Sequence, residues 1–314
     1  MRTDIDIEIS EVGPRDGLQS ISPIMATADK KRWISALAAA GLPEIEVGSF
    51  VPAKILPQLA DTGELVAHAK TIENLQVAVL VPNFRGAQNA IEAGADKITI
   101  PLSVSQTHSL KNVRRTHEQM YEEVVRIRAL IDTLPKQNRP VLEGGLSTAF
   151  GCTLEGQIDD SVVFHCAEKL IASGCDEVGL SDTTGYGLPT QVRRLTKGIW
   201  QAVGKDKLTG IHLHNTRGQG LANVIAAIDV GLTTVDASMG GIGGCPFAPG
   251  ASGNIITEDL VFLLEGMGLK TGVNYERLLQ AREVLRNSLP DSVALYGFTP
   301  DAGIPKGLAL ATPQ

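Results

Sequence analysis

The chain has 314 residues, of which 43% are hydrophobic and 20% are charged, and its net charge is −7. This composition is ordinary for a folded globular protein, and it excludes a mainly disordered chain and a fibrous repeat. The acidic balance lacks the basic character of nucleic-acid-binding proteins, so we expect no nucleic-acid partner. The length suits one (β/α)8 barrel, which needs about 250 residues plus insertions.

The chain shows no pattern of secretion or membrane insertion. No apolar run reaches the roughly 18 residues of a transmembrane helix, so we expect no membrane partner. The opening MRTDIDIEIS is acidic and alternating, without the basic and apolar regions of a signal peptide. The cysteines, Cys152, Cys166, Cys175 and Cys245, form no CxxC pair, which is typical of reduced thiols. We therefore expect a cytoplasmic protein.

Short runs rich in β-branched residues alternate with longer amphipathic stretches. The runs predict strands at Ile7–Val12, Glu44–Gly48, Val77–Val81, Lys97–Ile100, Pro140–Leu146, Glu177–Leu180, Gly210–His214 and Thr234–Ser238. The stretches predict helices at Lys30–Ala40, Thr116–Ile131, Ser161–Ala172, Thr190–Ala202, Gly220–Val230 and Glu258–Met267. Thr27 is the expected N-cap of the first helix. Expected helix C-caps are Gly41, Gly94, Gly174 and Gly231.

This alternation predicts parallel strands joined by right-handed crossovers. Eight units that close on themselves give a single α/β TIM barrel, over about residues 5–268 of one catalytic domain. A helix at Tyr275–Ser288 and a Pro/Gly-rich tail form a short C-terminal helical extension, over about residues 269–314. A doubly wound sheet is the alternative fold, but GPRDGL after the first strand does not match the GxGxxG loop of that fold.

Functional side chains of a TIM barrel lie at the C-terminal ends of the strands and in the loops that follow. Arg15 and Asp16 come directly after the first predicted strand, in a turn fixed by Gly13, Pro14 and Gly17. The two opposite charges form either a structural ion pair or a positioned functional site.

Two histidines, His212 and His214, flank Leu213 in the seventh predicted strand. Residues two apart in a strand point to the same face, so both imidazoles project together. A single strand histidine is usually a satisfied core residue, whereas a pair at this spacing predicts joint ligation of a divalent metal.

The loop after the eighth predicted strand is rich in glycine, with six glycines from Gly240 to Gly253. It is either a mobile surface loop or an active-site lid that carries the thiol of Cys245. Asn254 follows it, at an expected helix N-terminus. The other three cysteines lie in or beside apolar segments, where we expect packing roles.

Two more carboxylates stand near the predicted mouth of the barrel. Glu46 lies in the second strand and Asp182 ends the sixth, and either residue can be a cap or half of an ion pair. One carboxylate, two imidazoles and the Asn254 amide suit Mg²⁺, Mn²⁺ or Co²⁺ better than structural zinc.

Seven segments, spanning most of the chain in order, resemble the 3-hydroxy-3-methylglutaryl-CoA lyase family, within the larger group of metal-dependent TIM-barrel lyases and Claisen-type synthases. The segments are EVGPRDGLQ (11–19), EIEVGSFV (44–51), PNFRGAQNAIEAGA (82–95), STAFGC (147–152), SDTTGYG (181–187), HLHNTRGQGLAN (212–223) and GGCPFAPGASGNIITEDLVFLLEGMG (243–268). The last segment is the most specific, because a cysteine-containing glycine loop followed by Asn and TEDL is the family's signature.

The resemblance implies a role for each matching residue. The implied metal ligands are Asp16, His212, His214 and Asn254. The resemblance further implies that Arg15 stabilises the enolate formed on the thioester and that Cys245 transfers a proton. The initial base stays open between Asp16 and His212, each of which is compromised as a base if it binds the metal. The implied substrate-binding residues are Arg15, Gln19, Glu46 and Asp182, and the residues implied to support the site from behind are Glu11 and Glu258.

The implied activity is metal-dependent cleavage of a tertiary 3-hydroxyacyl-CoA by a homodimer with Mg²⁺, Mn²⁺ or Co²⁺. The first candidate substrate is 3-hydroxy-3-methylglutaryl-CoA, which gives acetyl-CoA and acetoacetate. The family pattern has Tyr where this chain has Gly145 and Ser where it has Gly179. Alternative substrates are therefore citramalyl-CoA, which gives pyruvate, and a homologue with a bulkier 3-substituent.

Two alternatives to a lyase have weaker support in the sequence. A Claisen-type synthase usually carries a long C-terminal extension, whereas this chain stops at residue 314. A non-catalytic barrel would tolerate the loss of Arg15, Cys245 or a metal ligand, yet all of these residues are present together.

Overall fold

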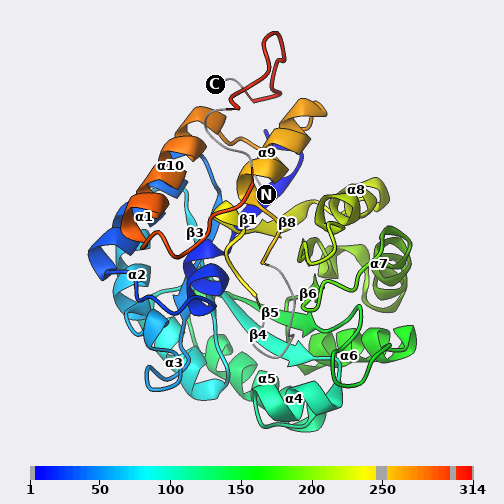
Figure 1. The fold of residues 1–314 in the computed structure, drawn as a ribbon. Coiled ribbons are helices and arrows are strands. Elements are labelled where there is room, and N and C mark those ends of the chain that lie inside the picture. The colour runs from blue at the N-terminus through cyan, green and yellow to red at the C-terminus, as the bar shows by residue number, and fades with distance from the viewer. Residues whose placement is uncertain (1–3, 245–252, 298–301, 313–314) are drawn as a thin grey trace.

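A computed structural model describes residues 4–244, 253–297 and 302–312. Eight parallel strands close into a barrel in which each strand pairs with its neighbour in chain order and β1 pairs with β8 (Figure 1). The strands are β1 (Glu8–Glu11), β2 (Glu44–Ser49), β3 (Gln76–Leu80), β4 (Lys97–Ser103), β5 (Val141–Ser147), β6 (Glu177–Ser181), β7 (Gly210–His212) and β8 (Thr234–Ala237). The expected TIM barrel is therefore confirmed.

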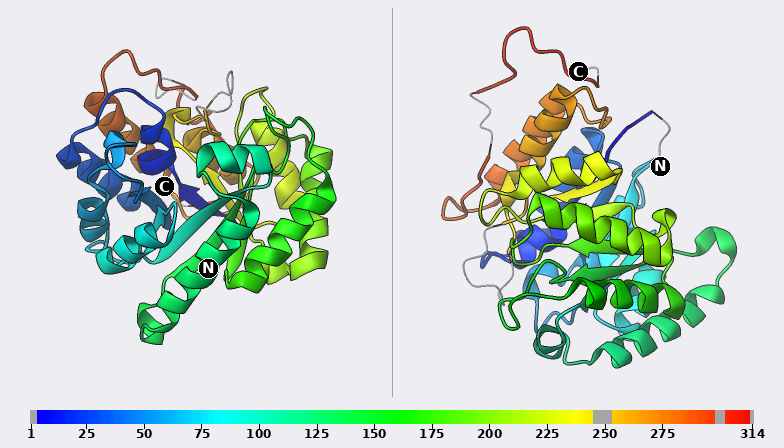
Figure 2. Two further views of the ribbon diagram at one scale, coloured as in Figure 1. Left: turned by 90° about the horizontal axis from the view of Figure 1, so that it is seen from below. Right: turned by 90° about the vertical axis from the view of Figure 1, so that its right-hand side faces the viewer.

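An outer layer of helices surrounds the strands (Figures 1 and 2). The α-helices in the described part of the chain are α1 (Thr27–Ala39), α2 (Thr62–Ala69), α3 (Phe84–Ala93), α4 (Gln106–Asn112), α5 (His117–Asp132), α6 (Asp160–Ser173), α7 (Pro189–Val203), α8 (Gly220–Val230), α9 (Thr257–Gly266) and α10 (Tyr275–Ser288). The expected helices all form. The sequence patterns do not resolve α2 and α4, because these helices have only 8 and 7 residues.

Local capping explains where several helices begin and end. The side chain of Asn83 accepts a hydrogen bond from the Gly86 N–H at the start of α3, and Gly94 ends that helix with a left-handed φ of 88°. The expected N-cap Thr27 is wrong by one position: it is the first residue of α1, and the extended Ala26 precedes it without a side-chain cap.

Strand β5 shows how the barrel divides its two faces. Leu142 and Leu146 are fully buried, and a Cβ on Gly144 would lie 2.8 Å from Leu170 of α6, so these residues face the helices. The alternate residue Glu143 points into the barrel, and 18% of its side chain stays exposed. The apolar core therefore lies between strands and helices, whereas the barrel interior is polar.

The first residues of β2, β4 and β6 meet at the amino-terminal end of this interior. The Lys97 Nζ atom lies 2.6 Å from Glu143, 2.9 Å from Glu177 and 3.7 Å from Glu44. Burial lowers the pKa of Lys97, but the three carboxylates outweigh it and raise the pKa well above its ordinary value. We call Glu44, Lys97, Glu143 and Glu177 the floor cluster.

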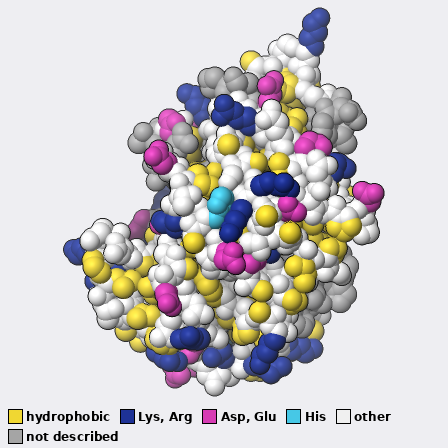
Figure 3. All heavy atoms as spheres, turned by 90° about the vertical axis from the view of Figure 1, so that its left-hand side faces the viewer, with side chains coloured by type: hydrophobic (Ala, Val, Ile, Leu, Met, Phe, Trp, Pro, Cys, Tyr) yellow, Lys and Arg dark blue, Asp and Glu magenta, His cyan; other side chains and the backbone are white. Residues whose placement is uncertain are grey.

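The C-terminal extension packs on the outside of the barrel. Helix α10 packs against α1 (Figure 1), and the Asn274 N–H donates to the Ala40 carbonyl at 2.8 Å. Within the described residues, no helix has the length and apolar character needed to span a membrane. On the face shown in Figure 3, basic and acidic side chains are interspersed.

Candidate metal centre and active site

Three segments far apart in the sequence meet at the carboxyl ends of the strands. A one-turn π-helix at Gly13–Gly17 follows β1 and presents Asp16. His212 ends β7, and His214 continues the chain into an isolated bridge with Asn254. The ligand atoms of Asp16, His212 and His214 all lie within 4.8 Å of one another. The structure thus brings together the residues that the sequence predicts to bind a metal.

The hydrogen bonds of the two imidazoles determine which ring nitrogens carry hydrogen. The Nδ1 atom of His214 lies 2.9 Å from the Thr183 carbonyl oxygen, which can only accept, so this nitrogen is the donor. The Nδ1 atom of His212 donates to Asp236 at 3.1 Å. In the neutral rings both Nε2 atoms therefore keep a lone pair, and these atoms face each other at 3.3 Å.

Two facing lone pairs repel unless a proton or a metal ion lies between them. Burial lowers the pKa of His212, but the hydrogen bond to Asp236 and the charges of Asp236 and Asp16 outweigh it, so the pKa lies above its ordinary value. The cluster therefore attracts positive charge.

The Asn254 amide completes the cluster. Its Nδ2 group donates to Asp16 at 2.7 Å and to the Ile242 carbonyl at 3.2 Å, which fixes the orientation of the amide. Its Oδ1 atom is buried and has no hydrogen-bond partner among the described residues. A buried oxygen left unpaired beside a carboxylate and two imidazoles fits the fourth ligand of a hard divalent cation.

Arg15 lies between two carboxylates at the edge of the cluster. Its Nε atom donates to Glu46 at 2.6 Å and its Nη1 atom donates to Asp16 at 2.7 Å. The Gln19 amide also donates to Asp16 at 2.7 Å. The Arg15 side chain keeps 12% of its surface exposed, so it can still reach a ligand in the mouth of the barrel.

The pKa values of the two carboxyl groups beside Arg15 shift in opposite directions. Burial raises the pKa of Asp16, but the charge of Arg15 and the neighbouring imidazoles outweigh it and hold the pKa well below its usual range. Burial raises the pKa of Glu46 to about 7, although Arg15 opposes this shift. Asp16 is therefore a permanent anion, as a metal ligand must be.

Glu11 supports the site from the end of β1. Its carboxyl accepts hydrogen bonds from the Thr257 hydroxyl at 2.6 Å and from the N–H groups of Gly13 at 2.8 Å and Met239 at 2.9 Å. Burial raises its pKa to about 8 in spite of these donors. Glu11 is thus hydrogen-bonded both to the turn that contains Asp16 and to the segment that follows β8.

Glu258 supports the same segment from α9. Its carboxylate accepts from the Gly240 N–H at 3.0 Å and pairs with the buried guanidinium of Arg282 on α10. The side chains of Glu258 and Arg282 are 0% and 1% exposed. The C-terminal extension is therefore coupled to the base of the glycine-rich loop.

Asp182 is fully buried at the end of β6. Its carboxylate accepts from the N–H groups of Tyr186 at 2.9 Å and Gly187 at 3.0 Å and so closes the turn after the strand. It does not begin a helix, because α7 starts only at Pro189. Burial raises the pKa of Asp182, although the two N–H donors and the charges of the histidines oppose this shift. The sequence identifies this carboxylate but not its hydrogen bonds.

Other expectations need correction or lie outside the described residues. Asn254 does not stand at a helix N-terminus, because α9 begins at Thr257. His214 lies beyond the end of β7. Cys245 and most of its loop fall within residues 245–252, which are outside the described part of the chain. The remaining cysteines are buried, as expected: Cys152, Cys166 and Cys175.

Three further residues support the site and were not predicted from the sequence. Asp236 of β8 pairs in register with His212, and its inward position could have been found from the alternation of that strand. Thr183 contributes only its backbone carbonyl, which no sequence pattern reveals. Arg282 lies in the extension, where a buried charge is not expected from sequence.

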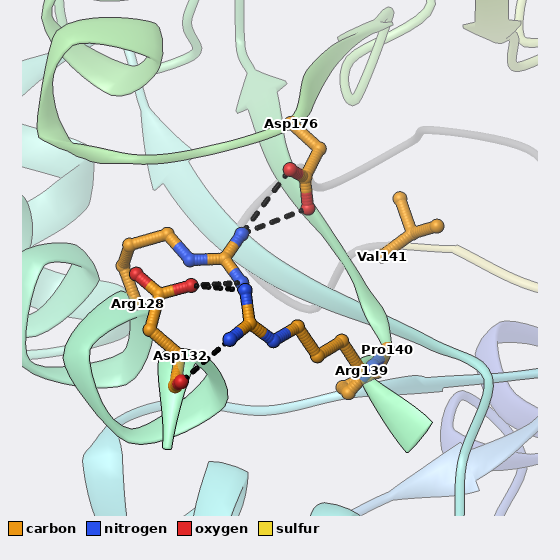
Figure 4. A pocket seen from close by; sticks show the side chains of 6 residues that line it. All are labelled: Arg128, Asp132, Arg139, Pro140, Val141 and Asp176. Atoms are coloured by element: carbon orange, nitrogen blue, oxygen red, sulfur yellow. Dashed lines mark hydrogen bonds and ion pairs between the residues drawn. The ribbon is translucent and has the colours of Figure 1, made fainter. Parts of the chain in front are cut away.

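A surface cavity lies at the opposite end of the barrel, at the start of β5 (Figure 4). Its two arginines are already paired: Arg128 with Asp132 and Asp176, and Arg139 with Asp132. Because active sites of TIM barrels lie at the carboxyl ends of the strands, this cavity is not the candidate active site.

Comparison with known proteins gives consistent matches. A family model described as HMGL-like matches residues 6–285. The mitochondrial hydroxymethylglutaryl-CoA lyase of Arabidopsis thaliana is 39% identical over 283 residues, which cover 90% of this chain and 59% of that protein. The cytoplasmic 3-hydroxy-3-methylglutaryl-CoA lyase of Rattus norvegicus is 38% identical over 279 residues, which cover 89% of this chain and 80% of that protein.

A solved structure resembles the whole fold. The HMG-CoA lyase from Acinetobacter baumannii in complex with coenzyme A and 3-methylmalate aligns over 98% of both chains, with a TM-score of 0.89 and 37% sequence identity.

Proposed function

The chain belongs to the HMGL-like family, and we propose that it is a metal-dependent lyase that cleaves 3-hydroxy-3-methylglutaryl-CoA into acetyl-CoA and acetoacetate. The observation that carries this proposal is the convergence of Asp16, His212 and His214, with the unpaired Asn254 oxygen, beside the guanidinium of Arg15. The names of the relatives and of the solved structure support the reaction class.

The four ligand groups would bind Mg²⁺ or Mn²⁺, with Co²⁺ as a further candidate, because carboxylate, amide oxygen and imidazole suit these ions together. Bound there, such an ion supplies the Lewis acidity that makes the alkoxide of the 3-hydroxyl accessible near neutral pH. Asp236 and the Thr183 carbonyl orient the two imidazoles so that both Nε2 atoms face the site.

Arg15 stabilises the charge that develops on the substrate. Its remaining N–H groups donate to the thioester oxygen, where negative charge grows as the C2–C3 bond breaks. Glu46 and Asp16 fix the guanidinium in advance, so little reorganisation is needed during the reaction. Gln19 restrains Asp16 in the same way.

The proton transfers balance within the site. The 3-hydroxyl loses its proton, the electron pair of the C2–C3 bond becomes the enolate of acetyl-CoA, and acetoacetate leaves. Of the two expected acceptors of the first proton, His212 is the better candidate, because the pKa of Asp16 lies well below its usual range. Each is also a metal ligand and therefore a weakened base. We assign the return of a proton to C2 to the thiol of Cys245, on the loop outside the described residues, and the proton held by the base then restores this thiol.

Citramalyl-CoA and substrates with bulkier 3-substituents remain the alternatives. The observation that bears on them is at Gly145, where a Cβ would make only ordinary contact, at 3.4 Å from Thr99, so packing does not require a glycine at this position. A Claisen-type synthase and a non-catalytic barrel are the weaker alternatives. We further propose that the substrate is an acyl-CoA and that the protein is a homodimer. Light scattering of the purified protein would test the dimer.

The deciding experiment supplies the purified protein with Mg²⁺ or Mn²⁺ and a panel of 3-hydroxyacyl-CoA thioesters. Mass spectrometry then identifies the oxo acid that appears with acetyl-CoA. We expect acetoacetate from 3-hydroxy-3-methylglutaryl-CoA, loss of activity on chelation, and recovery when metal is added back. Release of no acetyl-CoA from any thioester, or activity that survives chelation, would contradict the proposal.

A further inference from the structure

Gly240 follows β8 closely and has a left-handed φ of 66°. Its N–H donates to the carboxylate of Glu258 on α9 at 3.0 Å, and its carbonyl accepts from the Tyr296 N–H at 2.8 Å. A Cβ on Gly240 would lie 2.9 Å from the Cδ2 atom of Leu295. Both backbone polar groups of Gly240 are therefore bonded to residues that follow the last barrel strand, and the segment after α10 packs directly against it.

The side chain of Arg282 joins the two partners of Gly240. Its Nη1 atom pairs with the Glu258 carboxylate and donates to the Tyr296 carbonyl at 3.0 Å. The hydrogen bonds among Gly240, Glu258, Arg282 and Tyr296 thus close into a ring, which we call the Gly240 ring. Because a guanidinium presents its N–H groups in fixed directions, one side chain sets the positions of both partners.

The segment held by the Gly240 ring contacts a candidate metal ligand. Ile242 comes two residues after Gly240, and its carbonyl accepts from the Nδ2 group of Asn254 at 3.2 Å. Between them, the Gly241 N–H donates to the Ser238 carbonyl at 2.9 Å and closes a tight turn after β8. A displacement of Gly240 would therefore move a carbonyl that orients the Asn254 amide.

Stability alone does not require an arginine at position 282. The other arginines of α10, Arg277 and Arg286, are exposed, whereas Arg282 is buried and its Nε atom has no hydrogen-bond partner among the described residues. An apolar side chain of similar volume would avoid the desolvation that a buried ion pair requires. The ion pair instead fixes where its two partners lie, because its hydrogen bonds are directional.

We propose that Arg282 is a positioning residue for the metal centre. Through the Gly240 ring it fixes the turn after β8, and through the Ile242 carbonyl this turn holds the Asn254 amide with its Oδ1 atom directed at the metal. The C-terminal extension thereby acts on the metal site through backbone hydrogen bonds. The inference rests on the proposed function, because it takes Asn254 as a ligand of the metal that the reaction uses.

The test measures metal binding rather than turnover. Calorimetric titration of the metal-free full chain with Mn²⁺ compares the unsubstituted protein with Arg282→Met. We expect the affinity for Mn²⁺ to fall about tenfold in this variant, as it does when a group that holds a metal ligand in place is removed. The matched control is Arg277→Met, which removes an exposed arginine of the same helix that donates to the Ala39 carbonyl at 3.3 Å, and it should leave the affinity unchanged.

Two further variants separate position from stability. Arg282→Met leaves the buried Glu258 carboxylate without its cation, whereas the double variant Arg282→Met/Glu258→Gln removes both charges and should unfold at a higher urea concentration. The double variant still lacks the donor to Tyr296, so its Mn²⁺ affinity should stay severalfold below that of the unsubstituted protein. Ile127→Ala removes a fully buried side chain of α5 and should lower the urea midpoint without changing the Mn²⁺ affinity.

Three results would overturn the proposal. The first is unchanged Mn²⁺ affinity in the Arg282 variants, and the second is an equal loss of affinity in Ile127→Ala. The third is failure of both Arg282 variants to fold, which would assign this arginine to the fold rather than to the metal site. If only Arg282→Met fails to fold, the affinity of the double variant decides.

The outcomes also separate the positioning role from the reaction. If the Arg282 variants lose Mn²⁺ affinity but the unsubstituted protein cleaves no 3-hydroxyacyl-CoA, the proposed reaction is wrong and the positioning role stands. If 3-hydroxy-3-methylglutaryl-CoA is cleaved but the Arg282 variants bind Mn²⁺ as tightly as the unsubstituted protein, the reaction stands and the positioning role is wrong.

Discussion

Negatively charged or electron-rich groups lie close together at both ends of the barrel interior. The two ends differ in whether a cation of the chain neutralises these groups. In the floor cluster, Lys97 lies within 3.7 Å of the carboxylates of Glu44, Glu143 and Glu177 and supplies the compensating charge itself. At the mouth, the Nε2 atoms of His212 and His214 face each other at 3.3 Å with no side-chain cation of the chain between them among the described residues.

The difference distinguishes a structural cluster from a binding site. Groups that meet a cation of their own chain are satisfied on folding and have no need of a ligand. At the mouth, Asp16 is paired with Arg15, but the two facing imidazoles and the unpaired Asn254 oxygen beside it have no such cation in the described part of the chain, and they reach a favourable state when a further cation arrives. Arg15 stands beside the mouth cluster rather than within it, where it remains available to a substrate.

The largest expected effect is on turnover. It tests whether Arg15 stabilises charge on the substrate or only neutralises the carboxylate of Asp16. Arg15→Met should reduce kcat by about 10²–10³, because it removes a donor aimed at developing charge, while Mn²⁺ still binds. Steady-state kinetics with a parallel metal titration checks both halves of this prediction. Unchanged turnover, or loss of metal binding together with turnover, would assign Arg15 a structural role.

The floor cluster should respond in stability instead. Lys97→Met leaves the largely buried carboxylates of the floor cluster without their cation and should lower the free energy of unfolding by about 3 kcal/mol. The matched control is Lys70→Met, which breaks the exposed pair with Asp96 and should cost less than about 1 kcal/mol. Denaturant unfolding of both variants measures the difference. Equal losses in the two variants would show that burial gives the floor cluster no more stability than the exposed Lys70–Asp96 pair.

Glu11 shows a third way in which a carboxyl group is accommodated in the interior: it keeps its proton and stays uncharged. Its pKa is about 8 in the folded protein against an ordinary value of 4.5, so the folded state binds the proton more tightly between these values. Stability contributed by this group is therefore complete below about pH 4.5 and is lost as the pH rises toward 8.

Glu11→Gln removes this titration while its amide can still accept from Gly13 and Met239 and donate to Thr257. Between pH 6 and pH 7 the variant should lose about 1 kcal/mol less unfolding free energy than the unsubstituted protein. Urea unfolding at the two pH values is the measurement. The same pH dependence in both proteins would mean that Glu11 is already ionised.

Much of the fold follows from local patterns. The alternation of β-branched runs with amphipathic stretches predicts the eight strands, and α10 (Tyr275–Ser288) matches its predicted bounds. The short helices α2 and α4 do not follow from periodicity, because they present only about two turns each.

The candidate site is less fully predictable. Strand alternation places His212 and His214 on one face, and their imidazoles do meet. Asn254 joins them through an antiparallel bridge to His214, which depends on the path of the chain after β8 and not on any local pattern. Lys97 is missed for a related reason, since a charged residue at the start of a strand usually lies at the surface, whereas here it faces three carboxylates.

Titration of the metal-free protein with Mn²⁺ tests the central claim most directly. We predict one ion bound per chain, with affinity reduced at least about 100-fold in His214→Ala and unchanged in His165→Ala, which removes an exposed histidine of α6. The absence of saturable Mn²⁺ binding, or equal affinity in both variants, would contradict the assignment of Asp16, His212, His214 and Asn254 as a metal site.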